Sequence, residues 1–396
     1  MRALLATALL VMVGCQAPQG GVFDFSGVVT GELRAFPANP RFADQDDDPL
    51  SVSVAVEPEI VYEWQDGLQR VVATPFVRVD SNDDDRTHAD LRELHWLYLG
   101  DSFTLLAGVG KVFWGVTESR HLVDVINQTD GVEDIDEEAK LGQPMVNLTL
   151  EGEWGALDLF YLPYFRERTF NEERLRGPFP ISSNPTYESS ADEGHQDWAV
   201  RWAHSLGDFD VGLSHFSGTS REPTLVPEVR ASGTVLRPHY ALMDQTGVDV
   251  QWTRDAWLCK LEAISRDDDQ RRFFAAVAGF EYTFFQFIDG YGNLGILSEL
   301  LVDDRSRRSP RTAFDHDVFV GARWSLEDAQ DTAILAGAVV DLQSPETLVS
   351  IEAERRVGDS WFVELTARLF LNTDSDSVAR ALSEDDFISL AVSYHF

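Results

Sequence analysis

The last nine residues of the chain alternate in a way that strongly limits what they can form. Ile388, Leu390, Val392, Tyr394 and Phe396 are large and apolar, and the residues between them are small or polar. Successive side chains of a β-strand point to opposite faces. The segment therefore predicts a strand with one face suited to hydrocarbon and the other suited to water.

The same alternation recurs along the chain. In residues 50–64, Val52, Val54, Val56, Ile60 and Tyr62 share one face, with serines and glutamates on the other. A search for this period predicts about eighteen strands. Their ranges are 23–36, 50–64, 68–80, 87–99, 102–114, 144–153, 155–166, 196–205, 208–217, 245–254, 256–266, 271–284, 293–303, 316–326, 331–342, 347–357, 360–371 and 387–396. Sixteen strands is the alternative, because 87–99 alternates poorly. A soluble β-sandwich also alternates, but there the polar face usually looks outward.

The connections between these segments alternate in length. Tight turns occur at 65–67, 100–101, 154, 206–207 and 358–359, and the long connections are 37–49, 115–143, 167–195, 218–244, 304–315 and 372–386. Aromatic residues of the apolar face gather near the tight-turn ends: Tyr62, Trp64, Trp202, Phe209, Trp252, Trp257, Tyr282, Trp324, Trp361, Tyr394 and Phe396. Short turns, long loops and an aromatic girdle are typical of membrane barrels.

The terminal Tyr394-x-Phe396, the alternation of loop lengths and the long third loop resemble those of bacterial outer-membrane β-barrels with porin architecture. We therefore expect an all-β fold: a transmembrane antiparallel up-and-down barrel of about 18 strands covering residues 22–396. The resemblance implies a passive channel for small hydrophilic solutes in the outer membrane of a Gram-negative bacterium, not an enzyme, with no cofactor. It also implies contact with outer-membrane lipid, lipopolysaccharide and the barrel-assembly machinery, and a homotrimer as the expected assembly.

Charge and the N-terminal segment agree with this expectation. The net charge is −35, with 67 acidic against 32 basic residues, which argues against nucleic acid as a partner. Residues 1–18 look like a secretion signal, with Arg2 before an apolar run that is too short to span a bilayer as a helix. Cys15 is a lipidation candidate, and an ordinary cleaved signal is the alternative.

Loop 115–143 is the candidate pore constriction, because a loop at this place in the strand order narrows the channel of porins. Its charged candidates are Glu118, Arg120, Asp124, Asp130, Glu133, Asp134, Asp136, Glu137 and Glu138. Carboxylates at a narrow point favour cations. A solvated surface loop is the alternative.

Strand parity also assigns charges of both signs to the pore lining. The candidates are Glu57, Glu59, Arg78, Arg166, Arg201, Lys260, Glu262, Arg323, Glu352, Arg356, Glu364 and Arg368. These side chains either set up a field across the pore or brace the wall through lateral ion pairs. For any single residue, bracing is the better expectation.

Three other interpretations compete with an open channel. The barrel could serve an exporter or have a sealed, structural lumen. Alternatively, His215 and Ser217, on the lipid-facing parity, resemble the catalytic pair of an outer-membrane phospholipase, although Gly218 follows Ser217 where that family has Asn.

Aspartate-rich loop tips such as 46–48, 83–85 and 267–269 could hold divalent cations against lipopolysaccharide, but solvation also explains them. No sequence motif for a metal site is present.

Overall fold

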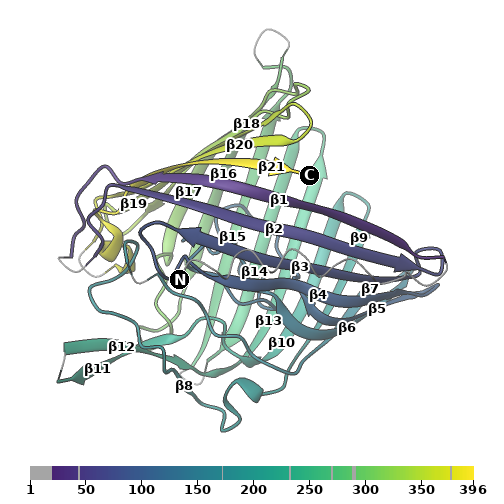
Figure 1. Cartoon of the computed structure of the whole chain (residues 1–396), viewed down its shortest axis with the longest axis horizontal. Helices are drawn as coiled ribbons and strands as arrows, with labels where there is room; N and C mark the ends of the chain where they lie inside the picture. The colour runs from purple at the N-terminus through teal and green to yellow at the C-terminus, as the bar shows by residue number, and fades with distance from the viewer. Residues whose placement is uncertain are drawn as a thin grey trace, which may run out of the picture.

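In the computed structural model, the chain forms a closed antiparallel barrel (Figure 1). The model describes residues 20–42, 45–171, 173–231, 233–268, 271–287, 291–374 and 377–396. The predicted signal segment and Cys15 lie outside the described residues. No helix in the described part of the chain is long and apolar enough to cross a membrane.

Eighteen strands make the wall, and each pairs with its neighbours in chain order. They are β1 (Val22–Ala35), β2 (Leu50–Trp64), β3 (Gln69–Asp80), β4 (Ala89–Leu99), β5 (Phe103–Gly110), β6 (Gln143–Gly152), β7 (Gly155–Leu162), β9 (Asp197–Leu206), β10 (Phe209–Thr219), β13 (Leu242–Arg254), β14 (Trp257–Asp267), β15 (Arg272–Phe284), β16 (Asn293–Asp303), β17 (His316–Ser325), β18 (Ala333–Asp341), β19 (Thr347–Val357), β20 (Trp361–Leu371) and β21 (Phe387–His395). Every predicted strand is present, so the count of 18 is confirmed.

The first and last strands close the barrel. β1 pairs with β21 from Val28 opposite His395 to Ala35 opposite Ile388. Beyond that ladder, the Gly27 and Phe396 backbones exchange two hydrogen bonds of 3.1 Å. The wall therefore has no free edge, which a barrel needs in hydrocarbon because unpaired backbone groups are costly there.

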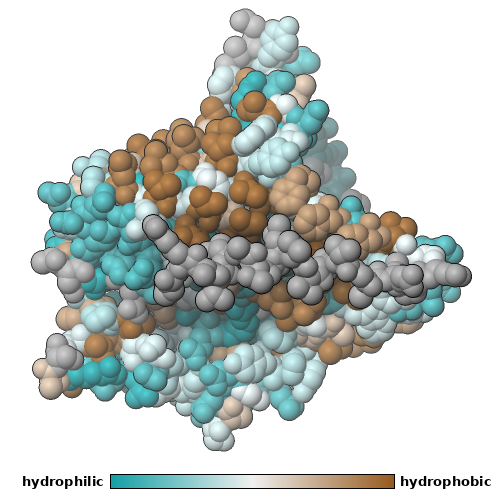
Figure 2. All heavy atoms as spheres, in the orientation of Figure 1, coloured by the Kyte–Doolittle hydropathy of each residue, from teal (hydrophilic) through white to brown (hydrophobic). Residues whose placement is uncertain are grey.

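Exposure along the strands runs opposite to that of a soluble protein. In β2, Val52 and Val54 are 52% and 48% exposed, whereas Ser51 and Ser53 are 8% and 2% exposed. Figure 2 shows the resulting hydrophobic outer surface over β18–β21, with hydrophilic surface at the end where the long loops gather. This pattern excludes the sandwich alternative, since a sandwich buries its apolar face.

The aromatic residues of the tight-turn end contact one another on the outer wall. Ring centroids are 4.6 Å apart for Trp257 and Tyr282 and 5.0 Å apart for Trp361 and Tyr394. Rings at this level suit a membrane–water boundary, where an amphipathic aromatic side chain is favoured.

β4 explains the poor alternation of residues 87–99. Its register with β3 shifts between Thr74 and Pro75, so that Thr74 faces Glu93 and Pro75 faces Leu91. Arg92 is the extra residue of this β-bulge, and one extra residue breaks a period of two.

One hairpin in the long loops was not expected. β11 (Thr224–Arg230) and β12 (Gly233–Tyr240) pair with each other, and β12 also pairs with the short β8 (Thr186–Tyr187). This small sheet projects beside the barrel at the loop end (Figure 1). Two short 3₁₀ turns, η1 (Asp192–Gly194) and η2 (Val378–Leu382), also lie in the loops.

Candidate functional site

The connection between β5 and β6, residues 111–142, folds into the barrel and is called the lumen loop below. Val123, Ile126 and Asp130 are each 0% exposed, so the loop is not a solvated surface loop. Its Trp114, Leu122, Val123, Val125 and Ile126 form one apolar cluster with inward-facing wall residues. Those wall residues are Met145, Phe160, Leu162, Ala199, Phe216, Met243, Ile264, Phe273, Ala275, Val277, Leu297, Leu301 and Phe319. The loop thereby covers the apolar inner surface of β6 through β17.

Two carboxylates of the wall hold the first half of the lumen loop. Glu262 on β14 accepts hydrogen bonds from the backbone N–H of Val116, Thr117 and Val123, at 2.7, 3.0 and 3.1 Å, and from the Thr117 hydroxyl at 2.7 Å. Glu262 is itself 0% exposed. A buried carboxylate with this many donors has its charge well stabilised.

Glu299 on β16 plays a similar part for the next residues. It accepts the backbone N–H of Glu118 and of Ser119, both at 2.8 Å, and the Ser119 hydroxyl at 2.6 Å. Parity places Glu299 inside, yet the sequence interpretation did not select it. Its signal was a carboxylate between Leu297 and Leu301 on the inward face of β16.

The acidic half of the lumen loop binds the wall on the other side of the barrel. Glu133 forms a bidentate pair with Arg78 of β3, with Nη2 to Oε2 at 2.7 Å and Nε to Oε1 at 3.0 Å. Asp136 lies 2.9 Å from Arg368 of β20. β3 and β14 are the third and eleventh strands on a ring of 18, so the loop crosses the bore.

Arg92, the bulge residue, also reaches the loop. Its Nη1 lies 2.6 Å from Asp130, whose other carboxylate oxygen accepts the Thr169 hydroxyl at 2.6 Å. Burial opposes ionisation of Asp130, but the nearby His88, the hydrogen bond from Thr169 and the charge of Arg92 outweigh it and lower the pKa of this carboxyl to about 2.

Asp136 has the opposite titration behaviour. Burial, with the charge of Asp134 beside it, raises the pKa of Asp136 to about 7, although Arg368 opposes the change. The lumen loop therefore carries one carboxyl that changes charge near neutral pH.

The remaining loop candidates other than Glu138 pair with the wall, with the loop itself or with the connection after β7. Glu118 lies 3.4 Å from Lys260 and 2.7 Å from Arg323, and Arg120 lies 3.1 Å from Asp303. Asp124 pairs with Lys140 inside the loop, and Glu137 pairs with Arg168. Glu138 is exposed, and Asp134 lies 3.8 Å from Arg368.

The lining candidates comprise braced bases, the bound acids Glu262 and Glu352, and three free acids. The bases are ion-paired: Arg78 with Glu32 and Glu133, Arg166 with Asp90, Arg201 with Asp249, Arg356 with Asp331, and Arg368 with Glu352. By contrast, within the described part of the chain no ion pair involves Glu57, Glu59 or Glu364. Glu354 also forms no ion pair with the described residues, and it lies directly opposite Glu364 where β19 pairs with β20.

These free carboxylates share one arc of the wall. β19, β20, β21, β1 and β2 are consecutive in the ring, and they carry Glu354, Glu364, Glu57 and Glu59 on inward parity. The apolar half of the lumen loop covers the other arc. The carboxylates of this arc and the acidic segment 134–138 therefore lie on the side of the bore away from the apolar half of the loop.

Two boundaries of the sequence interpretation were wrong. The predicted strands 102–114 and 155–166 end earlier, at Gly110 and Leu162. Phe165, the penultimate residue of the predicted strand 155–166, is instead 1% exposed and packs against Tyr240, with ring centroids 4.8 Å apart. The chain turns inward after Leu162, so parity counted beyond that residue does not hold.

A network of arginines surrounds Glu32. Glu32 of β1 lies 3.0 Å from Arg34, 2.8 Å from Arg78 and 2.9 Å from Arg86. Arg86 comes from the connection between β3 and β4, so periodicity gave no signal for it.

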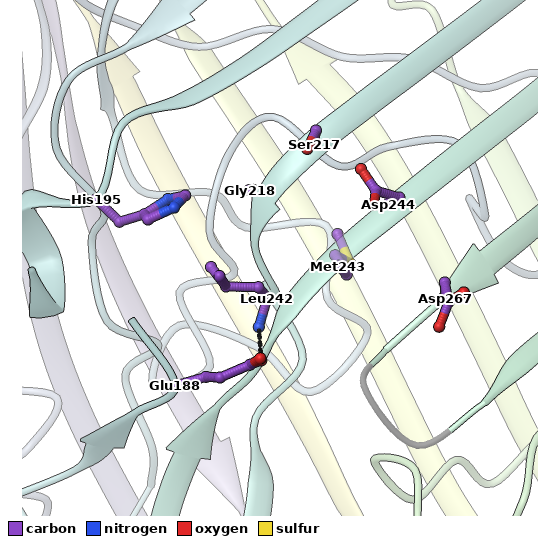
Figure 3. A pocket seen from close by; sticks show the side chains of 8 residues that line it. All are labelled: Glu188, His195, Ser217, Gly218, Leu242, Met243, Asp244 and Asp267. Atoms are coloured by element: carbon purple, nitrogen blue, oxygen red, sulfur yellow. Dashed lines mark hydrogen bonds between the residues drawn. The ribbon is translucent and has the colours of Figure 1, made fainter. Parts of the chain in front are cut away.

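The proposed hydrolase pair does not form. His215 Nδ1 lies 2.9 Å from the hydroxyl of Thr246, and among the described residues no hydrogen bond joins Ser217 to a histidine. Ser217 instead lines a cavity of about 240 Å³ with Glu188, His195, Gly218, Leu242, Met243, Asp244 and Asp267 (Figure 3). His195 is held by Asp197 at 2.8 Å.

No family model and no curated protein matches the chain. Solved structures with a similar fold include a mutant of the Rhodobacter blastica porin (Y96W, S119W), 13% identical with a TM-score of 0.45. A loop-deletion mutant of OmpT, an outer-membrane protein of Vibrio cholerae, is 10% identical with a TM-score of 0.45. Both alignments cover 95% of this chain and 100% of the other. The architecture of this chain is porin-like, and its own strand pairing establishes that fold.

Proposed function

We propose that this chain is a passive outer-membrane channel for small hydrophilic solutes, with a preference for cations. The observation that carries the proposal is the division of the lumen. One arc is closed by the apolar half of the lumen loop, and the other is lined by free carboxylates.

The inward-facing arginines and glutamates of the wall differ in whether they are paired. The inward arginines Arg78, Arg201 and Arg368 each contact at least one carboxylate, so their fields are largely cancelled at a distance. Glu354, Glu364, Glu57 and Glu59 lack such partners in the described residues. A low-dielectric wall focuses their field on the passage, which raises the local concentration of cations.

A sealed barrel or an exporter is the competing function. The arc from β19 to β2 supplies the distinction, because its carboxylates Glu354, Glu364, Glu57 and Glu59 have no ion-pair partner in the described part of the chain. A sealed lumen would require that arc to be filled as well, and free carboxylates filled in this way would pay a large desolvation cost.

Planar-bilayer recording of the purified barrel tests the proposal. We expect stable single-channel steps and, in a KCl gradient, a reversal potential of the sign that marks cation selectivity. Neutralising the loop with Glu133→Gln, Asp134→Asn, Asp136→Asn, Glu137→Gln and Glu138→Gln should reduce that potential. Absence of steps from folded protein would favour a sealed barrel, and unchanged selectivity would remove the loop from the pore.

A liposome-swelling series identifies the solute class. Uncharged sugars of increasing size, amino acids and organic cations should enter at rates that fall with size and rise with positive charge. Uniform exclusion of all three classes by vesicles that contain folded barrels would contradict a diffusion channel.

A further inference from the structure

One cluster of side chains in the barrel has the composition of a transition-metal site. His88 lies in the connection between β3 and β4, whereas Asp130 and Glu133 come from the lumen loop. One ligand atom from each residue lies within 4.8 Å of the others. Sequence reasoning expected no metal site because these residues are separated by two strands and a loop.

The imidazole of His88 is oriented as metal-binding imidazoles are. Its Nδ1 lies 3.1 Å from the carbonyl oxygen of Arg86. Donation of the Nδ1 proton to that carbonyl leaves the lone pair on Nε2, and a second-shell carbonyl of this kind commonly fixes the ligating tautomer.

The Nε2 atom is buried and makes no hydrogen bond with the described residues. It lies 3.6 Å from Asp130 Oδ2 and 3.5 Å from Glu133 Oε1. Both separations exceed the range of about 2.7–3.2 Å for an N–H···O hydrogen bond. Ligand atoms bound tetrahedrally at about 2.0–2.1 Å stand about 3.4 Å apart, which is close to both separations.

The carboxylates already contact two guanidinium groups, so an incoming cation must share them. Arg92 binds Asp130 and Arg78 binds Glu133. A carboxylate has about four lone-pair directions, and one guanidinium uses one or two of them. Two more carboxylates, those of Asp85 and Asp90, line the same cavity as His88.

That cavity provides both access and a fourth ligand position. It encloses about 290 Å³, and His88, Asp90, Arg166 and Thr169 are among the residues that line it. A hydrated ion could enter there and retain a water molecule, which suits a zinc site with three protein ligands.

We propose that His88, Asp130 and Glu133 bind a divalent transition metal of the zinc class, which cross-links the 81–88 connection to the lumen loop. One imidazole and two carboxylates suit Zn²⁺ better than Mg²⁺ or Ca²⁺, which prefer oxygen ligands alone. The inference goes beyond the channel function and does not depend on whether the lumen conducts.

Zn²⁺ binding to the untagged full chain in detergent, followed by isothermal titration calorimetry, tests the site. His88→Asn keeps an amide donor near the position of Nδ1 and removes Nε2. The matched control is His215→Asn on the outer wall, where the histidine contacts Thr246. We expect one Zn²⁺ per chain in wild type and the control, and at least a ten-fold loss of affinity in His88→Asn. Equal binding by wild type and His88→Asn, or no binding by wild type, would overturn the proposal.

Two further measurements guard against a variant that fails to fold. Zn²⁺ should raise the thermal midpoint of wild type and of His215→Asn but not of His88→Asn. X-ray absorption at the zinc edge of the wild-type complex should show one imidazole nitrogen among oxygen ligands. A shell made only of oxygen would reject the assignment without any variant.

Discussion

The backbone N–H of Thr117 donates a 3.0 Å hydrogen bond to Glu262, a carboxylate on the opposite side of the bore from β3. The same carboxylate accepts from the Thr117 hydroxyl, so one side chain of the wall fixes the entry of the lumen loop. The width of the proposed passage thus depends on a wall residue that does not itself face it.

Replacing Glu262 should loosen the loop. Glu262→Gln puts an amide group among N–H donors, and each buried donor left unsatisfied costs about 1–3 kcal/mol. We expect a larger and noisier single-channel conductance and a lower thermal midpoint in detergent. Glu281→Gln is the matched control, because Glu281 faces the lumen from β15 and its ion pair is with Arg323 of the wall. Equal conductance in the two variants would show that Glu262 does not hold the loop in the pore.

Removing the facing carboxylates of β19 and β20 should weaken cation preference. Two charges at roughly 8 Å change the energy of a passing cation by about 1 kcal/mol before salt screening. The double variant Glu354→Gln/Glu364→Gln should therefore lower the cation-to-anion permeability ratio several-fold at low salt. The control is Glu228→Gln, in the exposed β11–β12 hairpin, where Glu228 pairs with Arg230. A ratio that matches the control would place the selective region elsewhere.

Asp136 should make selectivity depend on pH. Burial and the charge of Asp134 raise its pKa to about 7, so it gains negative charge as the pH rises through that value. Cation preference should rise over the same interval, and Asp136→Asn should abolish this step. Glu137→Gln is an informative comparison, because the pKa of Glu137 is lowered despite burial, chiefly by Arg168. That variant should reduce selectivity at every pH yet keep the step.

The same titration affects stability, with a definite sign. A carboxyl whose pKa is raised by folding favours the folded state while it is protonated. The contribution is complete below the unfolded value of 3.8 and is lost as the pH rises through about 7. Thermal midpoints of wild type should therefore fall over this window more than those of Asp136→Asn. Parallel curves for the two proteins would contradict the assignment.

Arg221 should be important for the stability of the loop end. It lies 2.8 Å from Asp197 of β9 and donates to the carbonyl of Ile126 at 3.1 Å. Arg221→Ala leaves Asp197 buried without that partner, which costs about 3–5 kcal/mol. Arg230→Ala, which breaks the exposed pair with Glu228, should cost much less, because solvent screens an exposed ion pair. Denaturant unfolding in detergent compares them, and similar losses would mean that the Arg221 contacts add little.

Periodicity predicted the wall well because every wall residue has only two environments. Val52 and Ser53 are neighbours in sequence, yet one is 52% and the other 2% exposed, and a similar contrast recurs along β3, β15 and β16. Periodicity fails at Arg92, because a bulge shifts the period by one residue and brings this arginine inward.

The interior was harder to predict. The sequence identified the acidic lumen loop, but Val123 and Ile126 could not be assigned to the inner wall without knowing which strands lie opposite. The β11–β12 hairpin did leave a signal, because Leu225, Val235 and Leu236 belong to short apolar runs flanking a turn. It was missed because the segment is shorter than a membrane strand and was taken as loop.

The contact between Thr117 and Glu262 joins residues 145 positions apart, and that between Ser119 and Glu299 spans 180. Each partner lies in the later half of the chain, whereas the loop belongs to the earlier half. During maturation the first half of the lumen loop therefore cannot dock fully until β14 and β16 have joined the growing sheet. Insertion of the loop is a late event, and the passage takes its final shape only after most of the wall exists.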